Sequence, residues 1–478
     1  MTLNKSIFIK YIPCTFALYI IVFISGCSPV GPDYKQPKTQ VSENWHAPME
    51  SGISSEELDP NTLTKWWTTI DDPKLTNFIE RAIANNLDLK IAIERIRESR
   101  ARRTIAEASL YPNLNSSGSA TKSRMRNISD TTSNYSANFD AGWEMDFFGG
   151  VRRSVEASNA DLQVSQENMY NTMVSLLSEV ALNYVEIRTY QARINSVQSS
   201  IDLQNETYQL ILWRNEAKLI DDLAVQQAKY NLESSRSQIP TLRAGLEQSM
   251  NSLAVLLGEE PGILQDELKE VEPIPTAPDS IAVGVPADVI RRRPDIRSAE
   301  RSLAAQTARI GVATAKLYPS FTLNGSLGLS TTSLSDISSG TWTLSGGPRF
   351  SWPVFDAGAI KQNINVQSAL FDEYLLQYKS VVLSAFKEVE DGLISYVQEQ
   401  QRRKNLEAAT QAAQSAVQLA SQEFEVGLTD FTTVLDTQRS LLSFQDQLAQ
   451  SDGTVTSNVI RLYKALGGGW ESFTSNEY

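Results

Sequence analysis

The chain has few of the residue types that build metal centres and histidine-based active sites. It contains two cysteines, Cys14 and Cys27, and one histidine, His46. Zinc sites and Ser-His-Asp triads depend on these residue types. Adjacent acids such as Asp71-Asp72 and Asp221-Asp222 could be taken for acid–base pairs, but acids in loops are usually solvated turn or capping residues. We therefore expect no enzyme, no metal site and no cofactor.

Basic clusters and long apolar runs are also scarce. The net charge is −13 at pH 7, and no run of consecutive lysine and arginine residues is longer than three. This charge argues against a nucleic-acid partner, because phosphates attract basic surfaces. After the first 27 residues, no run reaches the ~20 apolar residues that a transmembrane helix requires.

The first 26 residues have the pattern of a secretory signal peptide. Lys5 and Lys10 form a basic start, an apolar stretch follows, and Ser25-Gly26-Cys27 ends it. This end resembles a bacterial lipobox, in which cleavage precedes an acylated cysteine, so we expect lipidation at Cys27. The residue after the cysteine influences sorting in bacterial lipoproteins. Here it is Ser28 and not an aspartate, which resembles the pattern of lipoproteins sorted to the outer membrane. The alternative is an uncleaved membrane anchor.

Proline is missing from two long stretches, which permits long helices. There is none between Pro112 and Pro240, and none after Pro353. Apolar residues recur every seven positions in both stretches, the spacing of helices that wind around one another. We predict helices over about 151–213 and 359–426, each ~100 Å long at 1.5 Å per residue. The residues at this spacing are Met173, Val180, Ile187, Ile194, Ile201 and Tyr208, then Leu375, Val382, Val389 and Tyr396.

Polar residues interrupt this apolar seam. Asn183, Gln191, Gln198 and Gln204 stand where a two-stranded coiled coil would carry leucine or isoleucine. A helix that faces neighbours on one side and a water-filled space on the other would tolerate them. The alternative is a solid, structural coiled coil, and the periodicity alone does not decide between the two.

Each long helix is expected to turn back on itself. Asp221-Asp222 interrupts the first pattern, and the segment from Gly427 to Asp430 interrupts the second. Return helices then extend to about residues 257 and 466. Pro240 lies in the first return helix, where its missing N–H should kink or break the helix.

The chain is a duplication. Ala108-Ser109-Leu110-Tyr111-Pro112 recurs 207 residues later as Ala315-Lys316-Leu317-Tyr318-Pro319, and Gly149 corresponds to Gly358 at a spacing of 209. A fixed internal spacing indicates a repeated structural unit. Each half has the pattern of a helix, a strand pair, a very long helix, a turn and a return helix.

After each Leu-Tyr-Pro the pattern changes to alternation of apolar and polar residues. The alternating runs cover 135–147, 321–330 and 342–352, with a weaker run at 114–122. An apolar face opposite a polar face is typical of a transmembrane β-barrel with a wet lumen, and also of a half-buried sheet in a soluble protein. Lipid requires a closed barrel, and single-chain barrels start at about 8 strands. Four strands therefore require association, and three copies would supply twelve.

These patterns predict an α+β membrane protein organised in six segments. In chain order they are a signal peptide (1–26), a lipidated N-terminus with a collar segment (27–75), a first repeat (76–257, hairpin at about 113–148), an equatorial segment (258–290), a second repeat (291–466, hairpin at about 320–355) and a C-terminal tail (467–478).

Five groups of residues, in the same order along the chain, resemble the motifs of one family. The chain is similar to the TolC/OprM-like outer-membrane efflux lipoproteins, the exit channels of tripartite resistance-nodulation-division (RND) pumps. The resemblance covers nearly everything after the signal segment. The motifs are Gly31 to Pro37; Trp66-Trp67, Asp72-Pro73 and Leu75 with Asn86-Leu87-Asp88-Leu89; Trp143 to Gly149; Val285 to Arg297; and Pro353 to Gly358.

This resemblance implies a homotrimer located in the outer membrane and extending into the periplasm. Its twelve strands would form one barrel and its twelve long helices a hollow α-barrel. The channel would work with a periplasmic adaptor and an inner-membrane RND transporter, among outer-membrane lipid, and would export small molecules such as drugs. A structural coiled-coil lipoprotein of the envelope and a type I secretion exit duct are the alternatives.

The resemblance also implies a gate at the periplasmic end. In the family, an aspartate in a Val-Leu-Asp run just after the second turn points into the closed aperture, and here that residue is Asp436. Thr432, Thr433 and Phe424 stand where relatives carry other gate residues. Lys218 stands where the family has a glycine in the first turn, and Gly427 is the glycine at the equivalent position of the second turn. The expected turn residues are Asp221, Asp222, Gly427 and Asp430.

Overall fold

The computed structural model describes residues 28–38, 42–56, 59–124, 131–278 and 280–471. The predicted signal segment, Cys27, the tip of the first hairpin at 125–130 and the end of the C-terminal tail lie outside these residues. The described chain divides into two compact units. Unit 1 comprises 28–38, 95–166 and 298–379, and unit 2 comprises 42–94, 167–297 and 380–471.

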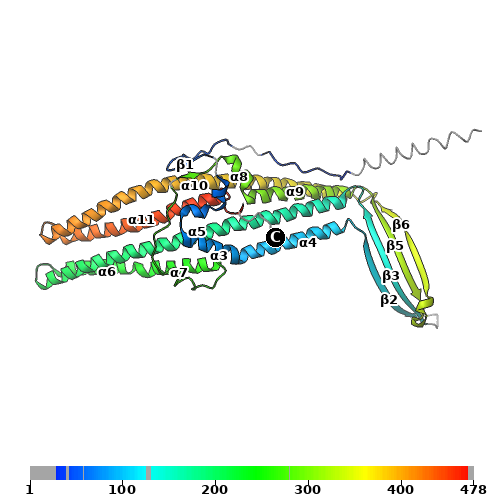
Figure 1. Ribbon diagram of the computed structural model, residues 1–478, viewed down its shortest axis with the longest axis horizontal. Coiled ribbons are helices and arrows are strands. Elements are labelled where there is room, and N and C mark those ends of the chain that lie inside the picture. Colours follow the sequence, from blue (N-terminus) through cyan, green and yellow to red (C-terminus); the bar gives the residue numbers. More distant parts are fainter. Residues whose placement is uncertain (1–27, 39–41, 57–58, 125–130, 279, 472–478) are drawn as a thin grey trace, which may run out of the picture. The chain divides into compact units, whose positions relative to one another are not determined.

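The two halves of the chain repeat the same elements. Helix α4 (Leu87–Ala108) and strand β2 (Asn113–Arg124) recur 207 residues later as α9 (Pro294–Ala315) and β5 (Ser320–Thr331). Both spacings equal the one between the two Leu-Tyr-Pro motifs. The predicted duplication is therefore confirmed at the level of secondary structure (Figure 1).

The long helices form at the predicted positions. Helix α5 (Gly150–Glu216) has 67 residues, and α10 (Ala359–Glu425), 209 positions later, also has 67. The return path is α6 (Asp222–Arg236) and α7 (Gln238–Leu256) in the first half and α11 (Phe431–Ala465) in the second. Among the described residues, no helix combines the length and the apolar character needed to cross a membrane.

Pro240 explains why the first return path is two helices and the second is one. It is the third residue of α7, and α6 ends four residues before it, at Arg236. A proline cannot donate to the carbonyl four residues earlier, so the helix is interrupted there. The amide of Ser237 still donates to the Glu233 oxygen at 2.9 Å. The predicted break is present, and proline-free α11 is continuous over the same stretch.

Four long strands form one antiparallel sheet in unit 1. Their order is β2, β3 (Thr131–Met145), β5, β6 (Thr341–Ser351), and the short helix η2 (Leu334–Ser339) connects the last two. The register places apolar residues opposite one another, as in the row Phe139, Leu327 and Leu344. Because side chains alternate between faces, this register puts all of the large apolar residues on one face.

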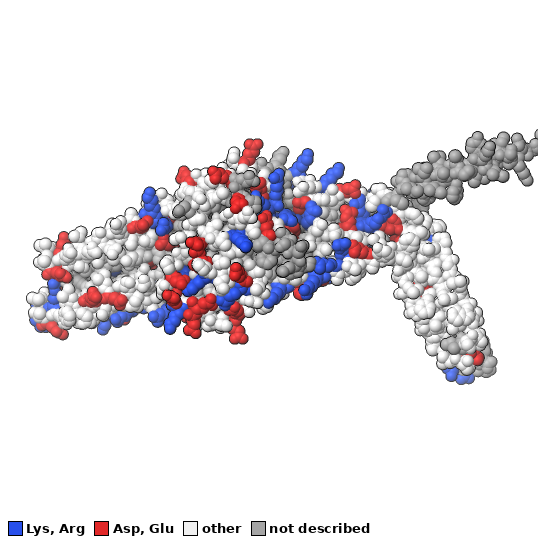
Figure 2. Space-filling model, viewed as in Figure 1, with Lys and Arg blue, Asp and Glu red and all other residues white. Residues whose placement is uncertain are grey.

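The two faces of the sheet differ in polarity as the alternation predicts. The apolar face is open to the surroundings in the single chain, where Leu344 is 83% exposed. The other face carries Asp140, Glu144 and Arg349, and the Ser326 hydroxyl donates to Asp140 at 2.6 Å. Figure 2 shows that the strands are almost free of charge on the side in view, whereas charges of both signs cover the helices.

Short elements of unit 2 gather around the start of the first repeat. The indole of Trp66 is buried and stacks on Tyr463 of α11, with ring centroids 5.6 Å apart. This packing attaches the segment before α3 to the C-terminal part of α11. The elements are β1 (Ile53–Ser54), paired in parallel with β4 (Ile281–Ala282), and α2 (Pro60–Thr64), η1 (Trp66–Ile70), α3 (Pro73–Asn85) and α8 (Pro286–Arg292).

Two of the signature motifs perform the same structural task. The Asn86 side chain donates to the Leu256 carbonyl at 2.9 Å, and the Arg293 guanidinium donates to the Ala465 carbonyl, also at 2.9 Å. The donors are 207 residues apart and the acceptors 209. The last carbonyls of a helix have no partner within the helix, so each motif caps the return helix of its own repeat.

Candidate functional site: the two hairpin turns and the residues behind them

The turn between α5 and α6 is a compact helix end. The amide of Lys218 donates to the Asn215 carbonyl at 2.8 Å, and that of Leu219 donates to the Arg214 carbonyl at 2.9 Å. This pattern is a Schellman motif, which needs a left-handed residue where Lys218 stands. The φ angle of Lys218 is 61°. Asp221 then caps α6 by accepting from the Ala224 amide at 3.0 Å.

The turn between α10 and α11 has the same geometry with a glycine at the strained position. Gly427, with a φ of 79°, donates to the Phe424 carbonyl at 3.2 Å, and Leu428 donates to the Glu423 carbonyl at 2.8 Å. Asp430 caps α11 by accepting from the Thr433 amide at 2.9 Å. The two turns are thus equivalent in backbone and differ in the side chain at the left-handed residue.

Thr432 and Thr433, two of the predicted gate residues, bind the capping carboxylate. Their hydroxyls donate to the same oxygen of Asp430, at 2.7 and 2.8 Å. These hydrogen bonds, with the hydroxyl of Thr432 contributing most, lower the pKa of Asp430 below its usual range. The structure therefore gives both threonines a local role in the turn, where they keep the cap ionised.

Phe424, another predicted gate residue, lies in the core beneath the two turns. Only 8% of its surface is exposed, and its ring lies 5.6 Å from that of Phe431. The core combines residues of all four helices at this end of unit 2, and its members are Ile211, Ala224, Ala228, Ala420, Phe424, Phe431, Val434 and Leu435. Any influence of Phe424 on a gate would therefore pass through packing.

Asp436, the central residue of the predicted gate, is on the surface of α11. Its side chain is 73% exposed and lies 3.4 Å from the Arg439 guanidinium. Arg439 also reaches α6, where it donates to the Asn231 amide oxygen at 2.7 Å and to the Tyr230 hydroxyl at 2.8 Å. The carboxylate is thus exposed on α11, and Arg439 holds the helix that carries it against α6.

The strain at Lys218 leads to a testable prediction. A left-handed conformation costs a non-glycine residue roughly 1–2 kcal/mol, and the extra backbone entropy of glycine in the unfolded chain offsets part of that. Lys218→Gly should therefore raise the free energy of local opening at this turn by about 0.5–1 kcal/mol, measured by hydrogen exchange of residues 214–224. Lys218→Ala removes the charge but keeps the strain, and it should leave exchange unchanged. If both substitutions have equal effects, backbone strain is not the cause.

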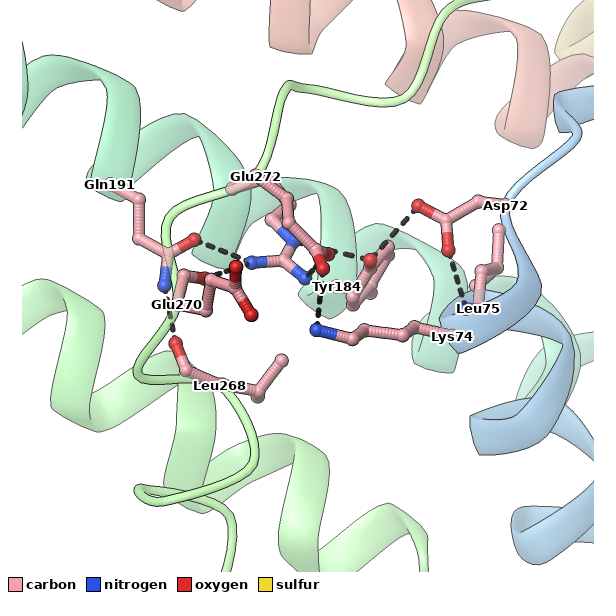
Figure 3. Close-up of polar contacts among 9 residues, drawn as sticks. Asp72, Lys74, Leu75, Tyr184, Gln191, Leu268, Glu270 and Glu272 are labelled. Carbon is pink, nitrogen blue, oxygen red and sulfur yellow. Dashed lines mark hydrogen bonds and ion pairs between the residues drawn. The ribbon is translucent and has the colours of Figure 1, made fainter.

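A second polar cluster, which the sequence did not reveal, surrounds Arg188 in the middle of α5. The Arg188 side chain is fully buried. It donates to the Gln191 side chain at 2.8 Å and to the Glu270 carbonyl at 2.9 Å, and it forms an ion pair with Glu272 (Figure 3). Tyr184 accepts from the same guanidinium at 3.1 Å.

This cluster attaches two other segments to α5. The Tyr184 hydroxyl donates to Asp72, which caps α3, at 2.9 Å, and Lys74 of α3 pairs with Glu272 at 2.6 Å (Figure 3). The Gln191 amide donates to the Leu268 carbonyl at 2.6 Å. The equatorial segment and α3 are therefore held in place by one buried guanidinium and its partners.

The polar side chains around the turns and around Arg188 act in capping, ion pairing and hydrogen bonding. Among the described residues, no group of three or more histidine, cysteine, aspartate or glutamate side chains could hold a metal ion. The acids named as possible pairs are capping or turn residues, since Asp72 caps α3 and Asp221 caps α6.

Comparison with known proteins decides the family. The model of the family described as "Outer membrane efflux protein" matches the chain twice, over residues 78–259 and 285–468. The chain belongs to this outer membrane efflux protein family. The two matches start 207 residues apart and end 209 apart, the same spacings as the internal repeat. As a member of the family, the chain is the outer-membrane channel component of an efflux pump and not an enzyme.

Individual members of the family are similar to the chain over nearly its whole length. Nodulation protein T of Rhizobium leguminosarum bv. trifolii is 32% identical, with 95% of this chain and 96% of that protein covered. The probable efflux pump outer membrane protein TtgC of Pseudomonas putida is 31% identical, with 95% of each covered. The solved outer-membrane channel OprN is 32% identical, with a TM-score of 0.85 over 92% of this chain and 99% of that one.

Proposed function

We propose that this outer membrane efflux protein works as a homotrimer whose twelve strands close into one membrane-spanning barrel. The observation that carries the proposal is the open sheet. Among the described residues, β2 and β6 each pair on one side only, and the apolar face between them is uncovered. Unpaired strand edges are not tolerated in lipid. Copies of the chain satisfy these edges by pairing β6 of one with β2 of the next.

The proposal includes a periplasmic adaptor and an inner-membrane RND transporter as partners. The support is the family itself and the printed names of relatives, such as the antibiotic efflux pump protein ArpC and the toluene efflux pump protein TtgC of Pseudomonas putida. An outer-membrane channel has no energy source of its own, so the inner-membrane partner drives transport. We propose small organic molecules, such as drugs and solvents, as the cargo.

A conductance measurement tests the channel. Purified protein reconstituted in a planar bilayer should give discrete openings, and cross-linking in detergent should yield a trimer. A structural coiled-coil lipoprotein would give no openings. A stable monomer that is soluble without detergent would contradict the proposal, because an uncovered apolar sheet cannot remain in water.

We further propose that Cys27 carries the lipid anchor. Val30, three residues after Cys27, donates its amide to the Phe148 carbonyl at 3.0 Å. Asp33 pairs with Arg153 of α5 at 2.7 Å. These contacts hold the start of the described chain at the end of β3, close to where the sheet would enter the membrane.

Lipidation leads to a prediction with a simple measurement. Cys27→Ser should abolish incorporation of labelled fatty acid, because the thiol is the acylated group. The variant should still be recovered in the outer membrane, since the strands provide an anchor of their own. Cys14→Ser is the matched control and should label like the wild type. Labelling that survives Cys27→Ser would exclude this site.

A further inference from the structure

The two hairpin turns carry different charges at their helix ends. A helix end accumulates negative partial charge, so a basic residue there is favourable. The last turn of α5 contains Arg214, but the last turn of α10 contains no basic residue and does contain Glu425. Glu423 occupies the position 209 residues after Arg214. The second repeat thus has an acid where the first has its arginine.

The side chain of Arg214 compensates for this difference. It extends from α5 to the end of α10 and donates to the Phe424 and Glu425 carbonyls, each at 3.3 Å. The guanidinium carbon also lies 4.5 Å from the centre of the Phe424 ring. One arginine therefore caps the α10 end with hydrogen bonds, a favourable charge and a stacked aromatic ring.

The contact between Arg214 and Phe424 joins the two turns, and Phe424 is itself part of the core beneath them. Phe424 packs on Phe431, the first residue of α11, with ring centroids 5.6 Å apart. The neighbouring Asn215 holds its own turn together by donating to the Ile220 carbonyl at 3.1 Å and to Asp222 at 3.0 Å. A displacement of one turn relative to the other would break the Arg214 contacts, because they run directly from the end of α5 to the end of α10, whereas Arg439 contacts α6 at Tyr230 and Asn231, further along the helices.

We propose that Arg214 is a positioning residue that couples the α5–α6 turn to the α10–α11 turn and keeps the channel end closed. This inference rests on the proposed channel function for its effect on conductance, but not for its effect on the distance between the turns. The planar guanidinium donates two hydrogen bonds and stacks on the Phe424 ring. A lysine keeps the positive charge but cannot reproduce this geometry, so it should restore only part of the coupling.

The distance between the turns tests the coupling directly. Leu219 and Leu428, at equivalent positions of the two turns, are 72% and 79% exposed and can be changed to cysteine for spin labelling. In a trimer each label is present three times, so variants labelled at only one of the two sites give the distances between chains. These can then be separated from the distance between 219 and 428 within one chain. The distribution between 219 and 428 should be narrow with Arg214, broad and longer with Arg214→Gln, and intermediate with Arg214→Lys. Arg236→Gln, which removes an exposed arginine paired with Glu233 inside α6, is the control and should leave it unchanged.

Conductance tests the consequence. The leak through Arg214→Gln channels should rise about tenfold, as expected for the loss of one stacked cation and two charge-assisted hydrogen bonds. The single-channel conductance of the open state should not change. An unchanged distance distribution overturns the coupling, and an unchanged leak in conducting channels overturns the effect on closure. If the wild-type protein forms no channel, the proposed function fails, while the distance measurement still decides whether Arg214 couples the turns.

Discussion

Replacing Arg188 with leucine should increase the exchange of amide hydrogens in the equatorial segment 264–278 about 100-fold. The guanidinium is fully buried and is bound by Gln191, Glu270, Glu272 and Tyr184. Leucine fills the space but leaves Tyr184, Gln191 and the Glu270 carbonyl without the guanidinium donor, while Glu272 keeps its pair with Lys74. Removing one member of a buried ion pair costs about 3–5 kcal/mol, and the partial exposure of Glu272 favours the low end of that range. A loss of about 3 kcal/mol in the free energy of local opening corresponds to the expected increase in the exchange rate.

A matched control separates burial from charge. Arg402 also pairs with a glutamate, in this case Glu399 of its own helix at 2.8 Å, but its side chain is 48% exposed. Surface pairs contribute about 0–1 kcal/mol, so Arg402→Leu should change exchange only slightly. If the two substitutions have the same effect on segment 264–278, the Arg188 cluster does not hold the equatorial segment.

The same cluster predicts a pH dependence. The hydrogen bond from Lys74, together with the charge of Arg188, lowers the pKa of Glu272 below its usual value of 4.5. A carboxyl whose pKa is lowered by folding stabilises the folded state above its unfolded pKa, and this stabilisation disappears as the pH falls through the folded pKa. Protection of segment 264–278 should thus be constant from about pH 8 to 6 and decline below about pH 4.5. Glu272→Gln should remove this decline, because the amide does not titrate.

Replacing Asp436 with alanine should raise the leak conductance of the closed channel and weaken its block by Mg²⁺. If the trimer forms as proposed and Asp436 has the gate position that the family resemblance implies, three copies of this exposed carboxylate should lie near the threefold axis, where they would attract divalent cations and repel one another. Arg439, 3.4 Å away, compensates each charge only in part because both groups are solvated.

The control is a similar ion pair in the middle of α10, distant along the helix from the turn that follows Glu425. Asp391 is exposed and pairs with Lys387 at 2.6 Å on the same helix. Asp391→Ala removes an equivalent charge, so it should leave both leak and Mg²⁺ block as in the wild type. If Asp436→Ala behaves like this control, Asp436 does not belong to the gate, although the channel itself would be unaffected by that result.

Much of the fold was predictable because it repeats and because its patterns are long. The heptad spacing from Met173 to Tyr208 extends over several turns, so it predicts a helix of unusual length. The helix observed, α5, continues only a few residues further at its C-terminal end. The alternating run at 135–147 likewise predicted strand β3 and its apolar face. Short elements such as β1, with two residues, have no detectable period and were not predicted.

The polar residues of the seam show where prediction from the sequence stopped. Gln191 and Gln198 both interrupt the apolar positions of α5, and the spacing treats them alike. In the structure, Gln191 is 4% exposed and bound to Arg188, whereas Gln198 is exposed. This difference in exposure arises because the equatorial segment, which is distant in sequence, covers Gln191 and accepts a hydrogen bond from it. Arg214 and Arg188 were missed for the same reason, since their partners lie 210 and 84 residues away.

The sequence by itself determined the duplication, the long helices, the alternating strands and the family, because each is written in residues that are close together or repeat at a fixed spacing. The tertiary structure decided which polar side chains are buried, which turns contact each other and which arginines connect them. These features depend on contacts between segments far apart in the chain, and in such contacts a side chain acquires its role from the neighbours that folding brings to it.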